Sequence, residues 1–203
     1  MPDAPLLILF VKYPEPGRVK TRLAADVGDE AAARIYRMMV ASIIGNLPQG
    51  TAIRIVYHRF RSETDYREWL DDPVLAEAEY VPQCEGDLGE RLTHAFAEAF
   101  QDGWEKVGVI GSDCVELTSR IYHDAWKELK KNDVVIGPTF DGGYYFLAMK
   151  HFQPALFTSI TWSTPIVFGQ TLLAAKMEQL SVALLPKLHD IDTLEDWKCA
   201  KIV

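Results

Sequence analysis

The sequence has few cysteines and no long hydrophobic run. Its 203 residues include only three cysteines, Cys84, Cys114 and Cys199, and no two of them form a CxxC pair. Thiols this sparse exclude a disulfide framework, so we expect a reducing, cytoplasmic setting. The chain also lacks a signal-peptide pattern and any apolar stretch near the ~20 residues of a membrane span, so we expect no membrane partner.

An excess of positive charge is missing as well. Lys and Arg total 21 against 29 Asp and Glu, which gives a formal net charge of -8. Nonspecific nucleic-acid binding needs a basic face that displaces counterions, and we therefore expect no nucleic-acid partner. A composition of 48% apolar and 25% charged residues is typical of a globular protein. The length suits one domain over residues 1–203, with the oligomeric state left open.

Several familiar catalytic motifs are absent. The chain has no G-x-x-x-x-G-K-S/T phosphate loop, no G-x-S-x-G nucleophile elbow and no G-x-G-x-x-G dinucleotide fingerprint. Its five histidines lack the spacing of zinc ligands. These catalytic templates therefore do not apply to this chain.

Apolar, β-branched-rich segments alternate with amphipathic ones along the chain. The apolar segments lie at 6–11, 52–57, 107–110, 134–136, 144–149 and 182–185, and helical spacing predicts helices over 30–44, 87–100 and 118–131. This alternation predicts an α/β fold with a mostly parallel sheet and crossover helices. Segments 134–136 and 144–149 are too close for a crossover helix, so we expect an antiparallel pair or a sharp turn, and a mixed sheet.

A loop rich in cations follows the first apolar segment. The carboxyl end of a buried strand points into the crevice where α/β proteins bind ligands. In an acidic protein, a basic loop at this place predicts a bound anion, and phosphate above all; the alternative is a solvated basic turn. The loop residues that we expect to contact the nucleotide are Lys12, Pro16, Gly17, Arg18, Lys20 and Arg22.

Two aspartates are candidate metal ligands. Asp113 ends a predicted buried strand, where a carboxylate is costly to desolvate unless it meets a cation such as a divalent metal. Its alternative role is to cap the helix that follows. Asp192 has capping-box spacing with Glu195, which favours a cap, but Asp190 and Asp192 could also face one side of an extended segment and complete a metal site.

A glycine-rich turn carries a third aspartate. In Asp141-Gly142-Gly143 the two glycines would let a substrate approach the backbone beside a carboxylate. Asp-Gly is equally typical of an ordinary hairpin turn. Trp162 is a further candidate for substrate binding, and a core position is the alternative.

These segments, in this order, resemble a bacterial family of the glycosyltransferase A superfamily, DUF2064, which includes arsenosugar-biosynthesis-type glycosyltransferases. The resemblance spans nearly the whole chain. It rests on residues 10–24, 86–92, 111–113, 137–145, 162–164 and 190–196.

The resemblance implies a Rossmann-like nucleotide-diphospho-sugar transferase fold, with the nucleotide at the end of the first strand and a metal at an acidic motif. The resemblance implies that the nucleotide loop contains Lys12, Arg18, Lys20 and Arg22. It also implies that Asp113 is the metal aspartate and Asp192 a second ligand. The acidic motif contains a single aspartate, where many glycosyltransferases have Asp-x-Asp.

The leading hypothesis is a transferase that binds a nucleoside-diphosphate sugar with Mg²⁺ or Mn²⁺ and passes the glycosyl group to a small acceptor. Lys20, Asp113 and Asp141 are its candidate catalytic residues. The first alternative is a nucleotidyltransferase that couples a nucleoside triphosphate to a phosphorylated molecule and releases pyrophosphate. The second alternative is a nucleotide-binding module without turnover.

Overall fold

The apolar run near the N-terminus forms a central strand, β1 (Leu6–Val11), which is buried on both faces. Leu7 and Leu9 belong to one core cluster, and Leu6 and Ile8 belong to a second one. A strand covered on both sides needs apolar side chains at every position, which explains why this run does not alternate with polar residues. The structure is a computed structural model that describes residues 4–200.

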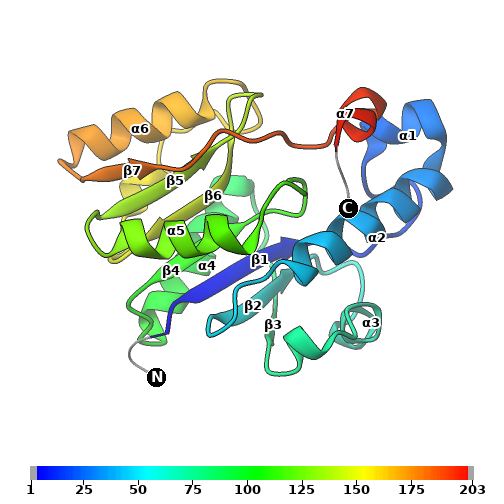
Figure 1. Ribbon diagram of the computed structural model, residues 1–203, viewed down its shortest axis with the longest axis horizontal. Coiled ribbons are helices and arrows are strands. Elements are labelled where there is room, and N and C mark those ends of the chain that lie inside the picture. The colour runs from blue at the N-terminus through cyan, green and yellow to red at the C-terminus, as the bar shows by residue number, and fades with distance from the viewer. Residues whose placement is uncertain (1–3, 201–203) are drawn as a thin grey trace.

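Seven strands form one mixed sheet in the order β3-β2-β1-β4-β6-β5-β7 (Figure 1). Strand β6 runs antiparallel to its neighbours β4 and β5, and the remaining pairs are parallel. The predicted mixed, mostly parallel sheet is thus confirmed. Besides β1, the strands are β2 (Ala52–Tyr57), β3 (Glu79–Pro82), β4 (Val107–Ile110), β5 (Val134–Pro138), β6 (Tyr144–Met149) and β7 (Val182–Leu184).

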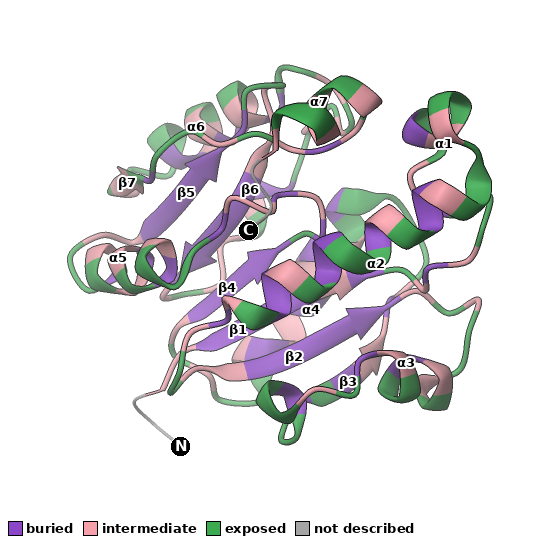
Figure 2. Ribbon diagram, turned by 45° about the vertical axis from the view of Figure 1, so that its right-hand side comes forward, coloured by how far each residue is buried: buried purple, intermediate pink, exposed green. Residues whose placement is uncertain are grey.

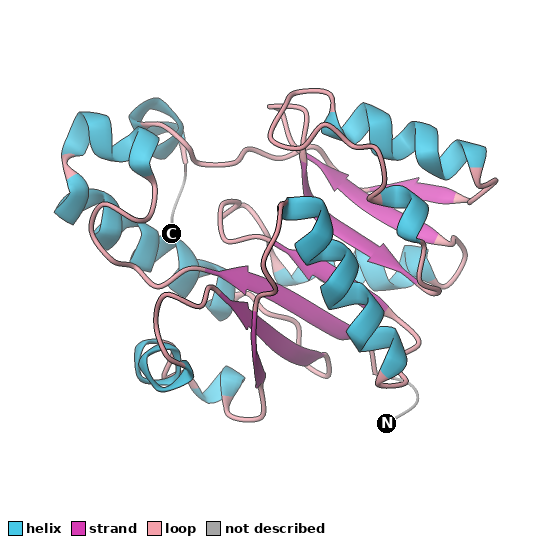
Figure 3. Cartoon of the chain, turned by 180° about the vertical axis from the view of Figure 1, so that it is seen from behind, coloured by secondary structure: helices cyan, strands magenta, loops and turns pink. Residues whose placement is uncertain are grey.

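Helices cover both faces of the sheet (Figures 2 and 3). They are α1 (Thr21–Val27), α2 (Asp29–Gly45), α3 (Glu63–Trp69), α4 (Leu88–Gln101), α5 (Ser119–Leu129), α6 (Val167–Met177) and α7 (Leu194–Cys199), with two 3-10 turns at Pro73–Leu75 and Pro154–Leu156. Helices α2, α3 and α5 contribute to the cluster with Leu7, whereas α4 and α6 contribute to the cluster with Ile8. Helix α1 lies outside these layers, and α7 packs beside it (Figure 1).

The helices and strands that were not predicted have weak hydrophobic patterns in the sequence. Strand β3 is a short edge strand that begins with exposed Glu79. In helix α6 the polar Thr171 is buried, whereas the apolar Leu173 and Met177 are exposed. Apolar residues therefore lie on several sides of the helix, and the sequence lacks the usual amphipathic pattern. Helices α1 and α3 each span only seven residues.

Helix α4 begins as predicted. The Asp87 side chain accepts from Glu90 N–H at 2.9 Å, and the Glu90 side chain accepts from Asp87 N–H at 2.8 Å. This capping box satisfies two amides that the first helical turn leaves without partners. Within residues 4–200, none of the helices has the length and hydrophobicity that a bilayer-spanning segment needs.

Candidate active site

The carboxyl ends of β1 and β4 open on the same edge of the sheet, where open α/β sheets bind ligands. Lys12 follows β1, and Asp113 lies in the loop after β4. After β7 the chain returns to this edge, and Ile191 N–H donates to the Asp113 carbonyl at 2.9 Å. Segments distant in the sequence are thereby joined through their backbones.

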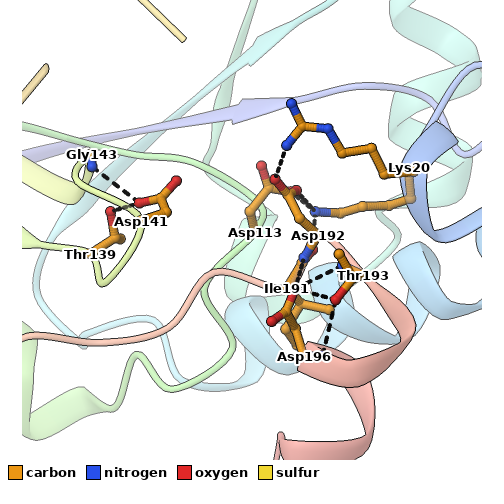
Figure 4. Close-up of polar contacts among 10 residues, drawn as sticks. Lys20, Asp113, Thr139, Asp141, Gly143, Ile191, Asp192, Thr193 and Asp196 are labelled. Carbon is orange, nitrogen blue, oxygen red and sulfur yellow. Dashed lines mark hydrogen bonds and ion pairs between the residues drawn. The ribbon is translucent and has the colours of Figure 1, made fainter. Parts of the chain in front are cut away.

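Lys20 lies at the centre of the polar group at this edge (Figure 4). Its ammonium is 2.5 Å from Asp113 Oδ1 and 3.5 Å from Asp192 Oδ1, and it donates to the Ile191 carbonyl at 2.5 Å. The Lys20 side chain is 6% exposed, whereas those of Asp113 and Asp192 are 49% and 43% exposed. The structure thus brings one predicted phosphate-binding residue together with both predicted metal ligands.

The backbone around Lys20 explains this placement. Lys20 is the N-cap of α1 and adopts a left-handed conformation, with φ 47°. Val19 and Leu23 on either side are buried and fix the main chain. Because α1 begins at Thr21, Arg22 lies in a helix and not in the loop to which the sequence analysis assigned it.

Asp192 is held by two cations and does not cap the final helix. Arg22 Nη1 lies 3.1 Å from Asp192 Oδ2, although the Arg22 side chain is mostly exposed. The capping box predicted for Asp192 and Glu195 is wrong, because Thr193 is the N-cap of α7. The Thr193 hydroxyl accepts from Asp196 N–H at 3.3 Å, and the Asp196 carboxylate accepts from Thr193 N–H at 2.8 Å.

The alternative role of Asp113 as a helix cap is also wrong. Thr118 is the N-cap of α5, so Asp113 lies outside that helix. Its carboxylate instead pairs with the Lys20 ammonium. The ion pair supplies the compensating cation that a carboxylate at the end of a buried strand requires.

Asp190 adds a further carboxyl group, which the sequence analysis treated only as a companion of Asp192. Burial, followed by the negative charges of Asp113 and Asp141, raises the pKa of Asp190 to about 7, and Lys20 acts in the opposite direction. Near neutral pH this group can therefore give or accept a proton. The sequence signal that points to it is the alternation of Asp190 and Asp192 around buried Ile191.

Asp141 lies in the hairpin between β5 and β6, at one side of the Lys20 group (Figure 4). Its Oδ1 accepts from the Thr139 hydroxyl and, at 3.1 Å, from Gly143 N–H. These bonds are typical of an Asp that stabilises its own turn, so the alternative of a hairpin turn is confirmed. Its role as a base or acceptor anchor stays a prediction.

The other predicted substrate-binding residues make close packing contacts. Gly142 has φ +94°, and a Cβ there would collide with the Pro165 backbone. The Trp162 ring lies against Gly89, where it leaves no room for a side chain, and edge-on to Tyr144 at 6.5 Å between ring centroids. Trp162 therefore joins the hairpin to the start of α4, and its contact with substrate stays a prediction.

Lys12 and Arg18 lie on the β2 side of the basic loop. The Arg18 guanidinium is 5.1 Å from the Phe60 ring centroid. Burial, then the charges of Lys12, Arg91 and Arg18, lower the pKa of His58. Pro16 and Gly17 form an exposed turn between Lys12 and Arg18, and Gly17 has φ +78°.

A cavity of about 300 Å³ opens at the ends of β2 and β3, on this cationic side. Its lining residues are His58, Arg59, Gln83, Cys84, Glu85, Gly86 and Arg91. Arg91 Nε is buried and has no hydrogen-bond partner. Arg91 also lines the cavity, so its guanidinium is a donor for a ligand with an acceptor atom.

Two buried tyrosines join the start of the basic loop to the neighbouring strand ends. The Tyr36 hydroxyl accepts from Lys12 N–H at 3.1 Å and donates to Ser112 Oγ at 2.9 Å. The Tyr66 hydroxyl accepts from Tyr13 N–H at 2.6 Å and donates to the His58 carbonyl at 3.0 Å. Sequence reasoning missed both residues, because their partners come from distant segments.

The donor chemistry near Lys20 fits a divalent cation. Carboxylate and carbonyl oxygens are the ligands that Mg²⁺ and Mn²⁺ prefer, and Asp113, Asp192 and the Ile191 carbonyl all surround one point. Within residues 4–200, however, no three His, Cys, Asp or Glu side chains are arranged to hold a metal. The Lys20 ammonium lies where such an ion would meet these oxygens.

The chain belongs to a family described as uncharacterized proteins conserved in bacteria (DUF2064), whose model matches residues 48–164. The match includes Asp113 and Asp141 but neither the basic loop nor Asp192. A comparison with curated proteins finds no match.

Solved structures give the same fold. A "putative nucleotide-diphospho-sugar transferase" from Desulfovibrio desulfuricans G20 is 35% identical, with a TM-score of 0.90 over 97% of this chain and 85% of its own. CMP:2-keto-3-deoxy-manno-octonic acid synthetase complexed with CTP is 8% identical, with a TM-score of 0.60 over 97% and 96%. Rv0371c of Mycobacterium tuberculosis H37Rv, solved with manganese, is 10% identical, with a TM-score of 0.58 over 98% of each chain. The predicted nucleotide-diphospho-sugar transferase fold is thus confirmed.

Proposed function

We propose that this protein is a metal-dependent transferase that binds a nucleoside-diphosphate sugar at the carboxyl edge of its sheet and passes the glycosyl group to a small acceptor. The observation that carries the proposal is the position of Lys20, at the end of a basic loop and between Asp113 and Asp192. A phosphate-binding cation and two hard carboxylates at one place suit a nucleotide diphosphate better than either feature alone.

The nucleotide extends from the cavity toward Lys20. Lys12 and Arg18 lie near His58, a lining residue of the cavity. The cavity has polar walls, and the Arg91 guanidinium offers a donor to an acceptor on the base or sugar. Cations on both sides of the Pro16–Gly17 turn then meet the phosphates, whose charge they offset.

Asp113 and Asp192 would hold the divalent cation. When bound, Mg²⁺ or Mn²⁺ neutralises charge on the departing diphosphate. Lys20 and Arg22 contribute positive charge toward the same phosphates. The Asp190 carboxylate can accept a proton from an acceptor hydroxyl, and Asp141 anchors that acceptor.

Nucleotidyl transfer is the second candidate function. Four cations in and beside one loop, Lys12, Arg18, Lys20 and Arg22, suit a triphosphate at least as well as a diphosphate. The similarity in fold to a synthetase that was solved with CTP adds support. In this reaction a phosphorylated substrate attacks the α-phosphate and pyrophosphate leaves.

A thermal-shift screen followed by product analysis tests the proposal. Nucleoside triphosphates and nucleotide sugars are each added with Mg²⁺, Mn²⁺ or EDTA. A ligand at about 100 times its dissociation constant stabilises the fold by about 2.7 kcal/mol, so the correct nucleotide raises the melting temperature clearly. We expect a metal-dependent rise with a nucleotide sugar.

The products separate the candidate reactions. Release of nucleoside diphosphate with a range of small acceptors supports glycosyl transfer, and release of pyrophosphate supports nucleotidyl transfer. Metal-dependent binding without either product across varied acceptors favours a binding module. The absence of a shift with every nucleotide would contradict the proposal as a whole.

A further inference from the structure

The Lys20 ammonium is more deeply buried than the carboxylates that surround it. Its side chain is 6% exposed, against 49% for Asp113 and 43% for Asp192. Exposed lysines usually keep the ammonium in water while the stem lies on the surface. Here the ammonium instead lies among three oxygens, those of Asp113, Asp192 and the Ile191 carbonyl.

These three oxygens are also the atoms that a divalent cation would use. The ammonium lies 2.5 Å from two of them and 3.5 Å from the third. A metal that takes these ligands needs contacts of about 2.0–2.2 Å and would come too close to the ammonium. The two positive charges would also repel one another strongly in this partly buried place.

We propose that Lys20 is a tethered cation that closes the metal site, so that the Lys20 ammonium and a divalent metal exclude each other. The inference rests on the proposed function only in taking Asp113 and Asp192 as the metal ligands. The site then accepts a metal after Lys20 has moved to another anion. In the bound state that anion is a phosphate of the nucleotide, and metal binding is therefore coupled to nucleotide binding.

The loop geometry supports such a movement. Lys20 is the last residue before α1, and it is one of four residues other than glycine with positive φ among those that the structure describes. A lysine in this conformation persists only where its surroundings hold it. Its contacts with Asp113 and Ile191 provide that hold, and a phosphate at the end of the basic loop offers the ammonium an equivalent partner.

Removal of the ammonium gives the sharpest test. Lys20→Met keeps the length of the side chain and removes its charge, and free Mn²⁺ is measured by electron paramagnetic resonance without nucleotide. We expect Lys20→Met to bind Mn²⁺ at least about tenfold more tightly than the wild type, because a competing cation is gone. Lys130→Met, at the end of α5, makes the same change in net charge and is expected to leave Mn²⁺ affinity unchanged.

Lys20→Arg keeps the charge and is expected to retain weak Mn²⁺ binding. Equal Mn²⁺ affinity in folded Lys20→Met and wild type would overturn the proposal, and so would an equal gain in Lys130→Met. If the proposal fails while nucleotides still produce a metal-dependent thermal shift, the proposed function stands. If no nucleotide binds but Lys20→Met gains Mn²⁺ affinity, the exclusion stands and the proposed function fails.

A measurement on the wild type covers the case in which Lys20→Met does not fold. Lysine acetylation, read by mass spectrometry, is compared at Lys20 and Lys130 as Mn²⁺ is raised, with Mn²⁺ occupancy measured in the same sample. Bound Mn²⁺ should increase the acetylation of Lys20 alone. Full Mn²⁺ occupancy with unchanged protection of Lys20 would overturn the proposal, and so would a site that stays empty at millimolar Mn²⁺ after acetylation has neutralised Lys20.

Discussion

The two sides of the basic loop meet opposite surroundings. On the β4 side, Lys20 and Arg22 are paired with Asp113 and Asp192. On the β2 side, burial and then the positive charges of Lys12, Arg91 and Arg18 lower the pKa of His58. The loop and the first turn of α1 therefore supply both a neutralised group, suited to a metal and its phosphates, and a cationic group beside a cavity. The nucleotide of the proposed function would therefore meet two kinds of electrostatics.

Asp113→Asn breaks the neutralised side and is expected to have the largest effect. The amide lacks the charge that both Lys20 and a divalent cation require, so metal-dependent nucleotide affinity should fall by about 3 kcal/mol, or more than a hundredfold. Calorimetry with Mg²⁺ measures the loss, and exposed Asp71→Asn serves as the control. An unchanged metal response in folded Asp113→Asn would remove this residue from the site.

Arg91→Met tests the cationic side in isolation. Loss of the guanidinium should weaken nucleotide binding by about 1.4 kcal/mol, or tenfold, because an acceptor on the nucleotide then loses its donor. Mn²⁺ binding without nucleotide should not change. Arg34→Met, an exposed position on α2, controls for net charge. A change in Mn²⁺ affinity as large as that in nucleotide affinity would show that the two sides do not act separately.

Asp190→Asn tests the neutralised side through the pH dependence of the free energy of unfolding. The folded pKa of Asp190 is raised to about 7, above its value in the unfolded chain, so the folded protein retains a proton that the unfolded chain has lost. Stability contributed by this group therefore falls as pH rises from about 4 to about 7 and stays lower above that range.

Asp190→Asn should thus stabilise the protein by about 1–2 kcal/mol at pH 8 and give no gain at pH 4, as measured by urea unfolding in EDTA. The control is Asp26→Asn, at an exposed position of α1. A gain that is equal at both pH values would contradict the assigned cause.

Thr193→Ala is expected to have the smallest effect on the site. It removes the hydroxyl that caps α7 and should lower the free energy of unfolding by about 1 kcal/mol. Asp192→Asn should change stability less, because its ion pairs are partly exposed, yet it should lose the metal-dependent shift with nucleotide. The reverse pattern in thermal melts would return Asp192 to the role of a cap.

Much of the fold was predictable because its signals are local. The apolar segments at 6–11, 52–57, 107–110 and 144–149 match strands β1, β2, β4 and β6 in both bounds. The capping box of α4 is also a local pattern. The cap of α7 was misplaced by one residue, since Asp192-x-x-Glu195 and Thr193-x-x-Asp196 both fit the motif and only the backbone direction decides between them.

The sequence predicted which residue types form the site, but it did not predict which of them contact one another. Lys20 and Asp113 were separate candidates, and their pairing depends on how β1 and β4 lie in the sheet. Tyr36 gives no signal at all in the sequence, because a buried tyrosine at helical spacing is indistinguishable from any core residue. Contacts between distant segments follow from the folded chain alone.

The most direct test of the nucleotide site is calorimetric titration of the double variant Lys20→Ala/Arg22→Ala at saturating Mg²⁺, with the nucleotide that gives the largest thermal shift in the wild type. The matched control is Lys127→Ala/Lys130→Ala, which removes two positive charges from α5 and its end. The account predicts a loss of about 3 kcal/mol in the first variant, since charged hydrogen bonds contribute about 1.5–3 kcal/mol each, and almost none in the control. Unchanged affinity in a folded Lys20→Ala/Arg22→Ala protein would contradict it.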